Sequence, residues 1–408
     1  MAPAGRTPVR QAERQTELQR LLDGAVQQQI ASAVCLAWGG PAGQATCLCA
    51  GATARPGLGL PLVPVTPQTR FDLASLTKPL VTALAAMVLV ERGLVDLEDP
   101  VGRFLPGWGG AGRRGRVRLR HLLAHEAGLP WWLPFHLALR SAEGEAAGAD
   151  RRLGPVRRTA LRTLLLALEP EHEPGCAAAL YSDPGYLLLG MALEEAAGEA
   201  LAPLVARALG PAWSGEELGF VDLEAGEEVG RLRLQPAWTR AQLLATAPGV
   251  AATELCPWRS RVVWAEVHDE NAHFLGGIAP HAGLFGTAPA VVRLGQALLA
   301  AAAGRPGSPL GGDVVRSFWE GGARRCGSTW ALGWDTPTPG SSSAGQRVSP
   351  RAVGHLGFTG TSLWLDPRRG AAVALLTNRV HPSRADERIK QLRPAVHDAV
   401  WGLLDLAG

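Results

Sequence analysis

Four short β-type runs lie near the two ends of this chain, and a long stretch of mainly helical pattern separates them. Residues 33–38 and 45–50 form the first pair, and residues 362–365 and 371–377 form the second. A strand buries its apolar face only by packing against another element, so strands from both ends must pair with each other. We therefore expect the 408 residues to form one domain, 1–408, whose two ends build a common sheet.

Helical periodicity predicts the elements around this sheet. Helical patterns cover residues from about 14 to 30, 75–91, 159–168, 185–209, 290–303 and about 384 to 405. The expected fold class is α/β (α+β), an antiparallel sheet flanked by helices plus a mainly helical lobe. The sheet lobe would take residues from about 15 to 70 and from 326 to 408, and the helical lobe residues 71–325.

Composition argues against two classes of partner. The net charge is +3 and the arginines are scattered among acids, without the basic stripe and interleaved aromatics of a nucleic-acid-binding face. No apolar run approaches the roughly 18 residues of a membrane-spanning helix, so no membrane partner is expected. The N-terminus lacks the apolar core of a secretory signal, which predicts a cytoplasmic location. The sequence leaves the oligomeric state open.

The cysteines and histidines show no metal-site spacing. The six cysteines follow no metal-binding pattern, and we expect them to be reduced and structural. His268, Asp269, His273 and His281 lie close in sequence, but their spacing fits no zinc or iron signature. Hydrogen bonds that stabilise a loop are the expected role of these side chains, and no metal is predicted.

Lysine is almost absent from this chain. Of the 40 basic residues only Lys78 and Lys390 are lysine, so positive charge is otherwise supplied by arginine. A buried lysine can lose its proton and act as a base, whereas a guanidinium stays charged. Lys78 follows Ser75 by three positions, which places both side chains on one helix face where they can touch. This spacing is the Ser-x-x-Lys signature of serine acyl-transfer enzymes.

Tyrosine is equally scarce, and both copies lie in the segment from Tyr181 to Tyr186. A phenol beside a lysine ammonium can have its pKa lowered enough to exchange protons with a serine hydroxyl. A third segment, residues 354–362, is rich in glycine and turns into a strand. Such a segment lets a substrate approach the backbone and can aim an N–H group at an oxyanion.

These three segments, in this order, resemble the penicillin-recognising serine hydrolases. That group contains class C β-lactamases, related penicillin-binding proteins and β-lactamase-like esterases. Ser75 and Lys78 match its first motif, and Tyr181-Ser182-Asp183 stands where the family has Tyr-x-Asn. His355-Leu356-Gly357 stands where it has Lys-Thr-Gly or His-Thr-Gly. The resemblance covers residues from about 15 to 405 and implies the DD-peptidase/β-lactamase-like fold.

The resemblance also implies roles for individual residues. Ser75 would be the nucleophile, Lys78 and Tyr181 would share the base role, and the backbone N–H groups of Ser75 and Phe358 would form the oxyanion hole. His355 would supply a weak, pH-dependent positive charge near Tyr181. No metal or organic cofactor is expected. The residues expected to contact substrate are Asp183, His355, Leu356 and Gly357.

Two departures from the family pattern bear on the substrate. Asp183 replaces an amide, which would keep Lys78 protonated and repel an anionic substrate, and Leu356 removes a hydroxyl that often binds the β-lactam carboxylate. We therefore expect hydrolysis of a small ester, amide or peptide. The alternatives are a true β-lactamase, a D-Ala-D-Ala carboxypeptidase, or a non-catalytic ligand-binding module on the same fold. Tryptophans that could wall an apolar pocket are Trp330, Trp334 and Trp364.

Overall fold

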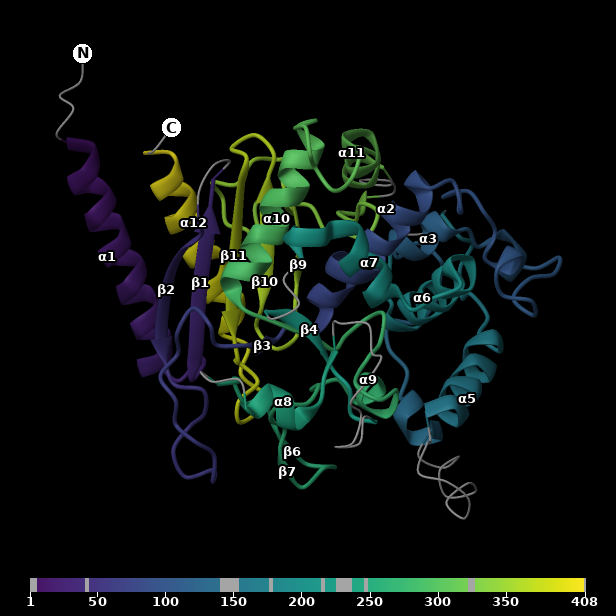
Figure 1. Cartoon of the computed structure of the whole chain (residues 1–408), viewed down its shortest axis with the longest axis horizontal. Helices are drawn as coiled ribbons and strands as arrows, with labels where there is room; N and C mark the ends of the chain where they lie inside the picture. Colours follow the sequence, from purple (N-terminus) through teal and green to yellow (C-terminus); the bar gives the residue numbers. More distant parts are fainter. Residues whose placement is uncertain are drawn as a thin grey trace.

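The computed structural model describes residues 6–40, 44–139, 154–175, 179–213, 217–224, 237–245, 249–321 and 327–406 (Figure 1). Its helices are α1 (Arg6–Gln27), η1 (Ala74–Leu76), η2 (Lys78–Ala83), α2 (Leu84–Glu91), η3 (Val101–Arg103), η4 (Arg114–Arg116), α3 (Leu119–Leu123), α5 (Gly154–Leu166), α6 (Asp183–Ala197), α7 (Leu201–Leu209), η5 (Gly210–Ala212), α8 (Arg240–Ala245), α9 (Glu270–Phe274), α10 (Ala288–Ala302), α11 (Gly312–Glu320) and α12 (Ile389–Leu404). Its strands are β1 (Ala33–Gly39), β2 (Thr46–Gly51), β3 (Phe71–Asp72), β4 (Leu218–Val221), β5 (Ala237–Trp238), β6 (Leu255–Cys256), β7 (Arg261–Val262), β8 (Leu284–Gly286), β9 (Val353–Leu356), β10 (Ser362–Asp366) and β11 (Ala371–Thr377).

The main sheet joins the two ends of the chain. Its strand order is β2-β1-β11-β10-β9, and every neighbouring pair is antiparallel. β1 lies against β11 in a register that runs from Val34 opposite Thr377 to Gly39 opposite Ala372. The predicted pairing of N-terminal and C-terminal strands is thus confirmed, as is the expected α/β class with an antiparallel sheet.

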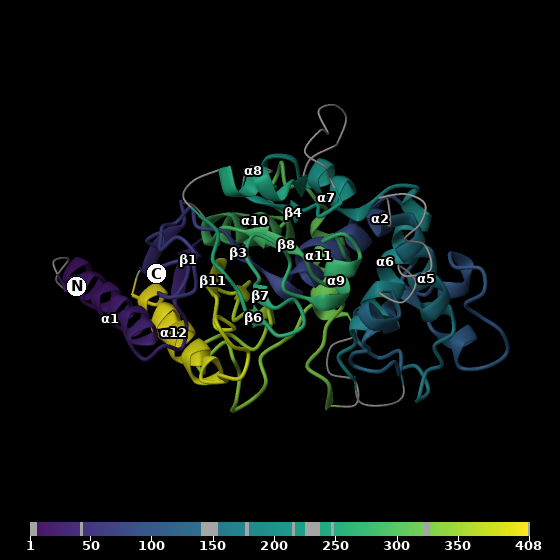
Figure 2. The same cartoon turned by 90° about the horizontal axis from the view of Figure 1, so that it is seen from below.

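Helices cover both faces of this sheet (Figures 1 and 2). Alternate residues of β1 explain why: Cys35 and Ala37 point into the core shared with α10, whereas Leu36 and Trp38 point into the core shared with α1 and α12. α10 packs closely on the sheet because Gly295 has no side chain, and a Cβ there would clash with Leu365. A strand buried on both faces loses the polar alternation of a solvent-exposed sheet.

The middle of the chain departs from the prediction in two ways. The pattern over residues 185–209 is two helices, α6 and α7, because Gly198 ends α6 in a left-handed conformation with φ of +66°. A second sheet, with strand order β3-β8-β4-β5, lies within the segment predicted to be mainly helical. Its strands are two to four residues long, too short to give a period-two signal.

One hydrophobic core runs from the sheet to the helices of the middle segment, with Cys35 and Leu363 at one end and Leu122 and Leu187 at the other. Continuity of this kind is typical of a single domain. The division into a sheet lobe and a helical lobe at residues 70/71 and 325/326 stays a prediction.

The segment Ala74–Glu91 is apolar and long enough to cross a membrane, contrary to the expectation from the sequence. In the fold, however, 83% of it is buried in the protein, as is typical of a central core helix. The cytoplasmic location stays a prediction. The cysteines Cys35, Cys47, Cys49 and Cys256 are free thiols, as expected, whereas Cys176 and Cys326 lie outside the described residues.

Candidate functional site

Ser75 lies in η1, where the chain passes from strand β3 into the buried core helix. Ala74, directly before it, has a φ of +48°, a left-handed conformation that residues with a Cβ rarely adopt. Asp72 holds this turn, because its carboxylate accepts hydrogen bonds from the backbone N–H of Ala74 at 2.8 Å and of His268 at 2.7 Å. The strained turn places the Ser75 side chain at the edge of a cavity.

Lys78 is completely buried one turn further along. Its Nζ lies 3.2 Å from Ser75 Oγ, 2.7 Å from Asp183 Oδ1 and 3.0 Å from the backbone oxygen of His281. Burial lowers the pKa of the Lys78 ammonium, and Asp183 opposes this by stabilising the charged form. Lys78 is thus a buried amine held against Ser75, and its positive charge is stabilised mainly by Asp183, with a further contribution from Asp269.

Tyr181 approaches Ser75 from the segment before α6. Its hydroxyl donates a hydrogen bond to Ser75 Oγ at 2.7 Å, and its ring centroid lies 4.8 Å from Lys78 Nζ. His125 and Trp330 hold the ring, with centroids at 4.6 Å and 5.6 Å. Burial and Asp183 raise the pKa of Tyr181 well above its ordinary value, so the expected lowering by Lys78 is wrong and the phenol keeps its proton.

His355, Leu356 and Gly357 lie on β9 and just after it, and all three line the same cavity as Ser75. Burial and then Lys78 lower the pKa of His355 to about 3. The imidazole is therefore neutral at physiological pH, and the expected pH-dependent positive charge is not present there. Gly357 approaches Ser75's own turn so closely that a Cβ would lie 2.6 Å from the backbone oxygen of Leu73.

Phe358 follows Gly357 in a tight loop. The loop is closed by a 2.8 Å hydrogen bond from Gly357 N–H to the backbone oxygen of Thr361. Among the described residues no acceptor binds the N–H of Phe358. Its side chain is 48% exposed and lines the cavity. A free backbone donor in the loop that lines the same cavity as Ser75 can stabilise a negative oxygen that forms there.

The cavity in front of Ser75 has a volume of about 590 Å³. It is lined by Ser75, Tyr181, Asp183, His355, Leu356, Gly357 and Phe358, with Lys78 directly behind. Of the three tryptophans considered from the sequence, only Trp330 reaches it; Trp334 and Trp364 are buried in the core. Trp131 and Trp132 line it instead, although nothing in their local sequence indicated this.

Sequence reasoning also missed several polar residues around the cavity, among them Asp269, Asp335 and Arg393. Burial raises the pKa of Asp335 to about 6. In the sequence Asp269 and His281 stand out only as members of a histidine-rich stretch; in the structure Asp269 lines the cavity and the backbone oxygen of His281 contacts Lys78. Arg393 lies on α12, which the sequence indicated only as a helix, without any sign of a role in the site.

The carboxylates of Asp183 and Asp269 and the ring of His281 each offer a ligand atom, and these atoms lie within 4.8 Å of one another. The ammonium of Lys78 contacts one member of the group, the carboxylate of Asp183, and the backbone oxygen of another, His281, so it supplies a positive charge there. His281 also pairs with Asp269 at 3.1 Å. Although burial raises it, the pKa of Asp269 is lowered overall, because His281 and this hydrogen bond favour the carboxylate.

The other two histidines of the sequence cluster 268–281, His268 and His273, face carboxylates outside this group of three. His268 Nε2 lies 3.1 Å from Glu254, and His273 Nδ1 lies 3.6 Å from Glu266. His268 and His281 each share a hydrogen bond with a carboxylate, whereas His273 Nδ1 has no hydrogen-bond partner among the described residues. The contacts of His268 and His281 fit the hydrogen-bonding role predicted from the sequence.

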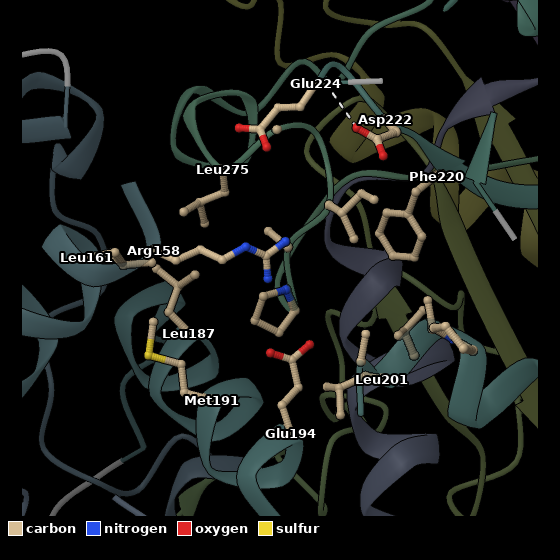
Figure 3. Close-up of a pocket in the computed structure, with 18 residues that line it drawn as sticks. Arg158, Leu161, Leu187, Met191, Glu194, Leu201, Phe220, Asp222, Glu224 and Leu275 are labelled. Atoms are coloured by element: carbon tan, nitrogen blue, oxygen red, sulfur yellow. Dashed lines mark hydrogen bonds between the residues drawn. The ribbon is translucent and has the colours of Figure 1, made fainter. Parts of the chain in front are cut away.

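A second cavity, of about 450 Å³, lies behind the core helix (Figure 3). Its walls are mainly apolar and include Val81, Leu187 and Phe220, and Arg158 crosses it between acidic side chains. None of the described residues that line it is serine, threonine, cysteine, tyrosine, histidine or lysine. It therefore offers no nucleophile or basic nitrogen for acyl transfer, and the Ser75 cavity is the candidate active site.

Comparison with known proteins agrees with this geometry. The sequence profile of the Beta-lactamase family matches residues 50–397. A protein of Escherichia coli (strain K12), named as a D-alanyl-D-alanine carboxypeptidase, is 27% identical over 337 residues, which are 79% of this chain and 72% of that protein. A protein of Salmonella typhi with the same name is 28% identical over 345 residues, with the same coverage.

Solved structures share the fold. The hydrolase EstCE1, described as having promiscuous acyltransferase activity, superposes with a TM-score of 0.67 at 20% identity, covering 97% of this chain and 100% of that one. A penicillin-binding protein homologue from Caulobacter crescentus superposes with a TM-score of 0.64 at 20% identity, covering 95% and 97%. At these identities the likeness establishes the architecture and leaves the substrate open.

Proposed function

Because the chain belongs to the beta-lactamase family of serine hydrolases, we propose that it cleaves an ester or amide bond through an acyl-enzyme formed on Ser75. One observation carries the assignment. Ser75 Oγ lies 2.7 Å from the Tyr181 hydroxyl and 3.2 Å from Lys78 Nζ, so a single serine has a proton donor and a buried amine within hydrogen-bond distance.

Lys78 is the better candidate for the base that accepts the serine proton. Burial lowers its pKa, whereas burial and Asp183 raise the pKa of Tyr181. A neutral amine is therefore more accessible at physiological pH than a phenolate. As Ser75 Oγ attacks the carbonyl carbon, its proton passes to Lys78 Nζ. The proton on Lys78 then returns to the leaving group through the Tyr181 hydroxyl, which gives up its own proton as it receives the one from Lys78, so that Tyr181 stays protonated. The same pair would activate water for deacylation.

The backbone N–H groups of Ser75 and Phe358 are the proposed oxyanion hole. Removal of one oxyanion donor typically costs about 10²–10³ in kcat, so this pair would supply a large share of the catalysis. His355, Leu356 and Gly357 would lie along the bound substrate, with His355 as a neutral hydrogen-bonding group.

The substrate is proposed to be a small ester, amide or peptide with an apolar portion. The aromatic wall of Trp131, Trp132 and Trp330 supports an apolar group, while Asp183 and Leu356 argue against an efficient β-lactamase. The names of the curated relatives make a peptide ending in D-Ala-D-Ala a necessary member of any substrate panel.

The direct test is covalent labelling. Wild-type protein is expected to react with a fluorescent fluorophosphonate and to hydrolyse p-nitrophenyl esters, and Ser75→Ala should lose both properties. Ser308→Ala, in an exposed loop, is the matched control and should label normally. A chelator should leave the activity unchanged. If the wild type shows neither an adduct nor turnover of ester, D-Ala-D-Ala peptide or cephalosporin, the enzyme proposal is wrong and the non-catalytic binding module remains.

A further inference from the structure

Arg393 of α12 is a buried cation without a carboxylate partner. Its side chain is 7% exposed, and its guanidinium donates hydrogen bonds to the backbone oxygens of Gly357 at 2.7 Å and Thr361 at 2.9 Å. Within the described part of the chain no carboxylate lies within ion-pair distance of it, and its Nε has no partner. The arginine thus supports the loop that lines the active site and itself reaches the edge of the cavity.

A buried charge without a counter-charge is costly. Burial, and then the nearby Arg379, lower the pKa of Arg393 to about 9, so the group still carries its charge at neutral pH. Two backbone carbonyls could equally be satisfied by a neutral amide side chain, which costs far less to bury than a guanidinium. A requirement for positive charge at this position therefore has to come from something other than loop closure.

The geometry identifies what the charge acts on. The carbonyl of Gly357 and the N–H of Phe358 are the two ends of one peptide group. A cation on the carbonyl oxygen polarises that peptide and strengthens its N–H as a donor, because hydrogen bonds in a chain reinforce one another at low dielectric. The N–H of Gly360 also donates to this carbonyl, at 3.0 Å, and so fixes the peptide from a second direction.

We propose that Arg393 is a positioning residue for the oxyanion hole, which orients and polarises the Gly357–Phe358 peptide so that the Phe358 N–H stabilises the tetrahedral oxyanion. The inference rests on the proposed acyl-transfer function. It adds a specific source of transition-state stabilisation from the last helix of the chain, at the edge of the cavity. The full positive charge also lies behind the place where negative charge develops, which favours the intermediate over the neutral substrate.

The test compares an ester with its thionoester, in which sulfur replaces the carbonyl oxygen. Sulfur accepts hydrogen bonds weakly, so a weaker oxyanion hole penalises the ester more than the thionoester. Arg393→Met is expected to lower kcat/KM for the p-nitrophenyl ester about 10-fold to 100-fold, less than loss of a direct oxyanion donor, and to lower the ester-to-thionoester ratio at least about 5-fold. Arg393→Lys, which keeps a charge, should recover much of that ratio.

Arg379→Met is the matched control. Arg379 also donates to a loop carbonyl, that of Phe358, at 2.9 Å, but the N–H of that peptide belongs to Thr359. Arg379→Met should therefore leave the ester-to-thionoester ratio of kcat/KM at the wild-type value even if the loop is disturbed. A boronic acid that mimics the tetrahedral intermediate should lose affinity for Arg393→Met by about the same factor as kcat/KM for the ester.

Equal losses for ester and thionoester in Arg393→Met, with unchanged boronate affinity, would overturn the inference and leave Arg393 as a loop clamp. A similar ratio change in Arg379→Met would overturn it as well. These outcomes differ from failure of the proposed function itself, which would appear as absence of an acyl-Ser75 adduct in the wild type. If Arg393→Met fails to fold, Arg393→Gln, which keeps hydrogen-bond donors but carries no charge, provides the same ratio and boronate comparison.

Discussion

Replacement of Asp183 by asparagine tests the assignment of Lys78 as the base. The Asp183 carboxylate lies 2.7 Å from Lys78 Nζ, and it opposes the lowering of the Lys78 pKa by burial. Two unit charges 2.7 Å apart attract by about 6 kcal/mol at an effective dielectric of about 20. This energy limits the amount by which Asp183 can raise the pKa of Lys78 to about 4 units. Because Asp183 is partly open to water, we expect Asp183→Asn to lower the pKa of Lys78 by about 2 units.

The sign of the effect on activity follows from the proton that the base must accept. Only neutral Lys78 can take the serine proton, so kcat/KM should be low below its pKa and level off above it. In Asp183→Asn the rising limb of the pH profile should therefore move to lower pH by about 2 units, measured with a p-nitrophenyl ester. Asp335→Asn, which removes a different carboxyl from the same cavity, should leave that limb in place.

A limb that stays within about half a pH unit of the wild-type position would refute the assignment. In that case either Lys78 is not the titrating base or the Asp183 contact does not control its charge. A shift in the opposite direction would mean that the limb reports a group other than an amine paired with this carboxylate.

The remaining predictions concern individual contacts. Tyr181→Phe removes the hydroxyl that is hydrogen-bonded to the nucleophile and should lower kcat about 10²-fold to 10⁴-fold. Circular dichroism checks that the variant is folded. A loss of kcat under about 5-fold would exclude Tyr181 from the proton transfer. Gly357→Ala adds a Cβ that overlaps the hydroxyl of Thr361, and its acylation rate by a fluorophosphonate should fall at least about 10-fold; normal labelling would show that the loop can shift without cost. Trp334→Ala should lower the free energy of unfolding in urea by about 3–5 kcal/mol because the side chain is fully buried. Trp131 is 62% exposed, so Trp131→Ala should change that free energy by less than about 0.5 kcal/mol and raise KM for apolar esters. Equal losses of stability in the two variants would contradict the assigned burial.

Local pattern predicted the outer parts of the fold well. Strands β1, β2, β10 and β11 were expected within a residue or two, because long apolar runs at both ends leave few other ways to bury them. The second sheet was missed, since β3, β5 and β8 are only two or three residues long. Strands of that length are defined by their partners rather than by their own pattern.

For the candidate site, the sequence likewise predicted some properties, the catalytic residues, but not others, their protonation states. Ser75, Lys78 and Tyr181 could be proposed from motif order and residue scarcity. The structure places Lys78 and Tyr181 each within hydrogen-bond distance of Ser75, and Lys78 against the Tyr181 ring. Their protonation was not predictable. The pKa of Tyr181 is raised and His355 is neutral because both are buried, and burial depends on residues far away in the sequence.

The sequence by itself therefore determined which residue types meet at the site, because acyl transfer needs a nucleophile and an ionisable neighbour at fixed local spacing. It also determined that the chain ends must pair, because their apolar strands have no other cover. Only the tertiary structure decided the charges: which carboxylate faces Lys78, which groups lose their water, and which cation stands behind the Gly357–Phe358 peptide. Electrostatic energies depend on distance and solvent exposure in three dimensions, and neither quantity can be read from neighbours along the chain.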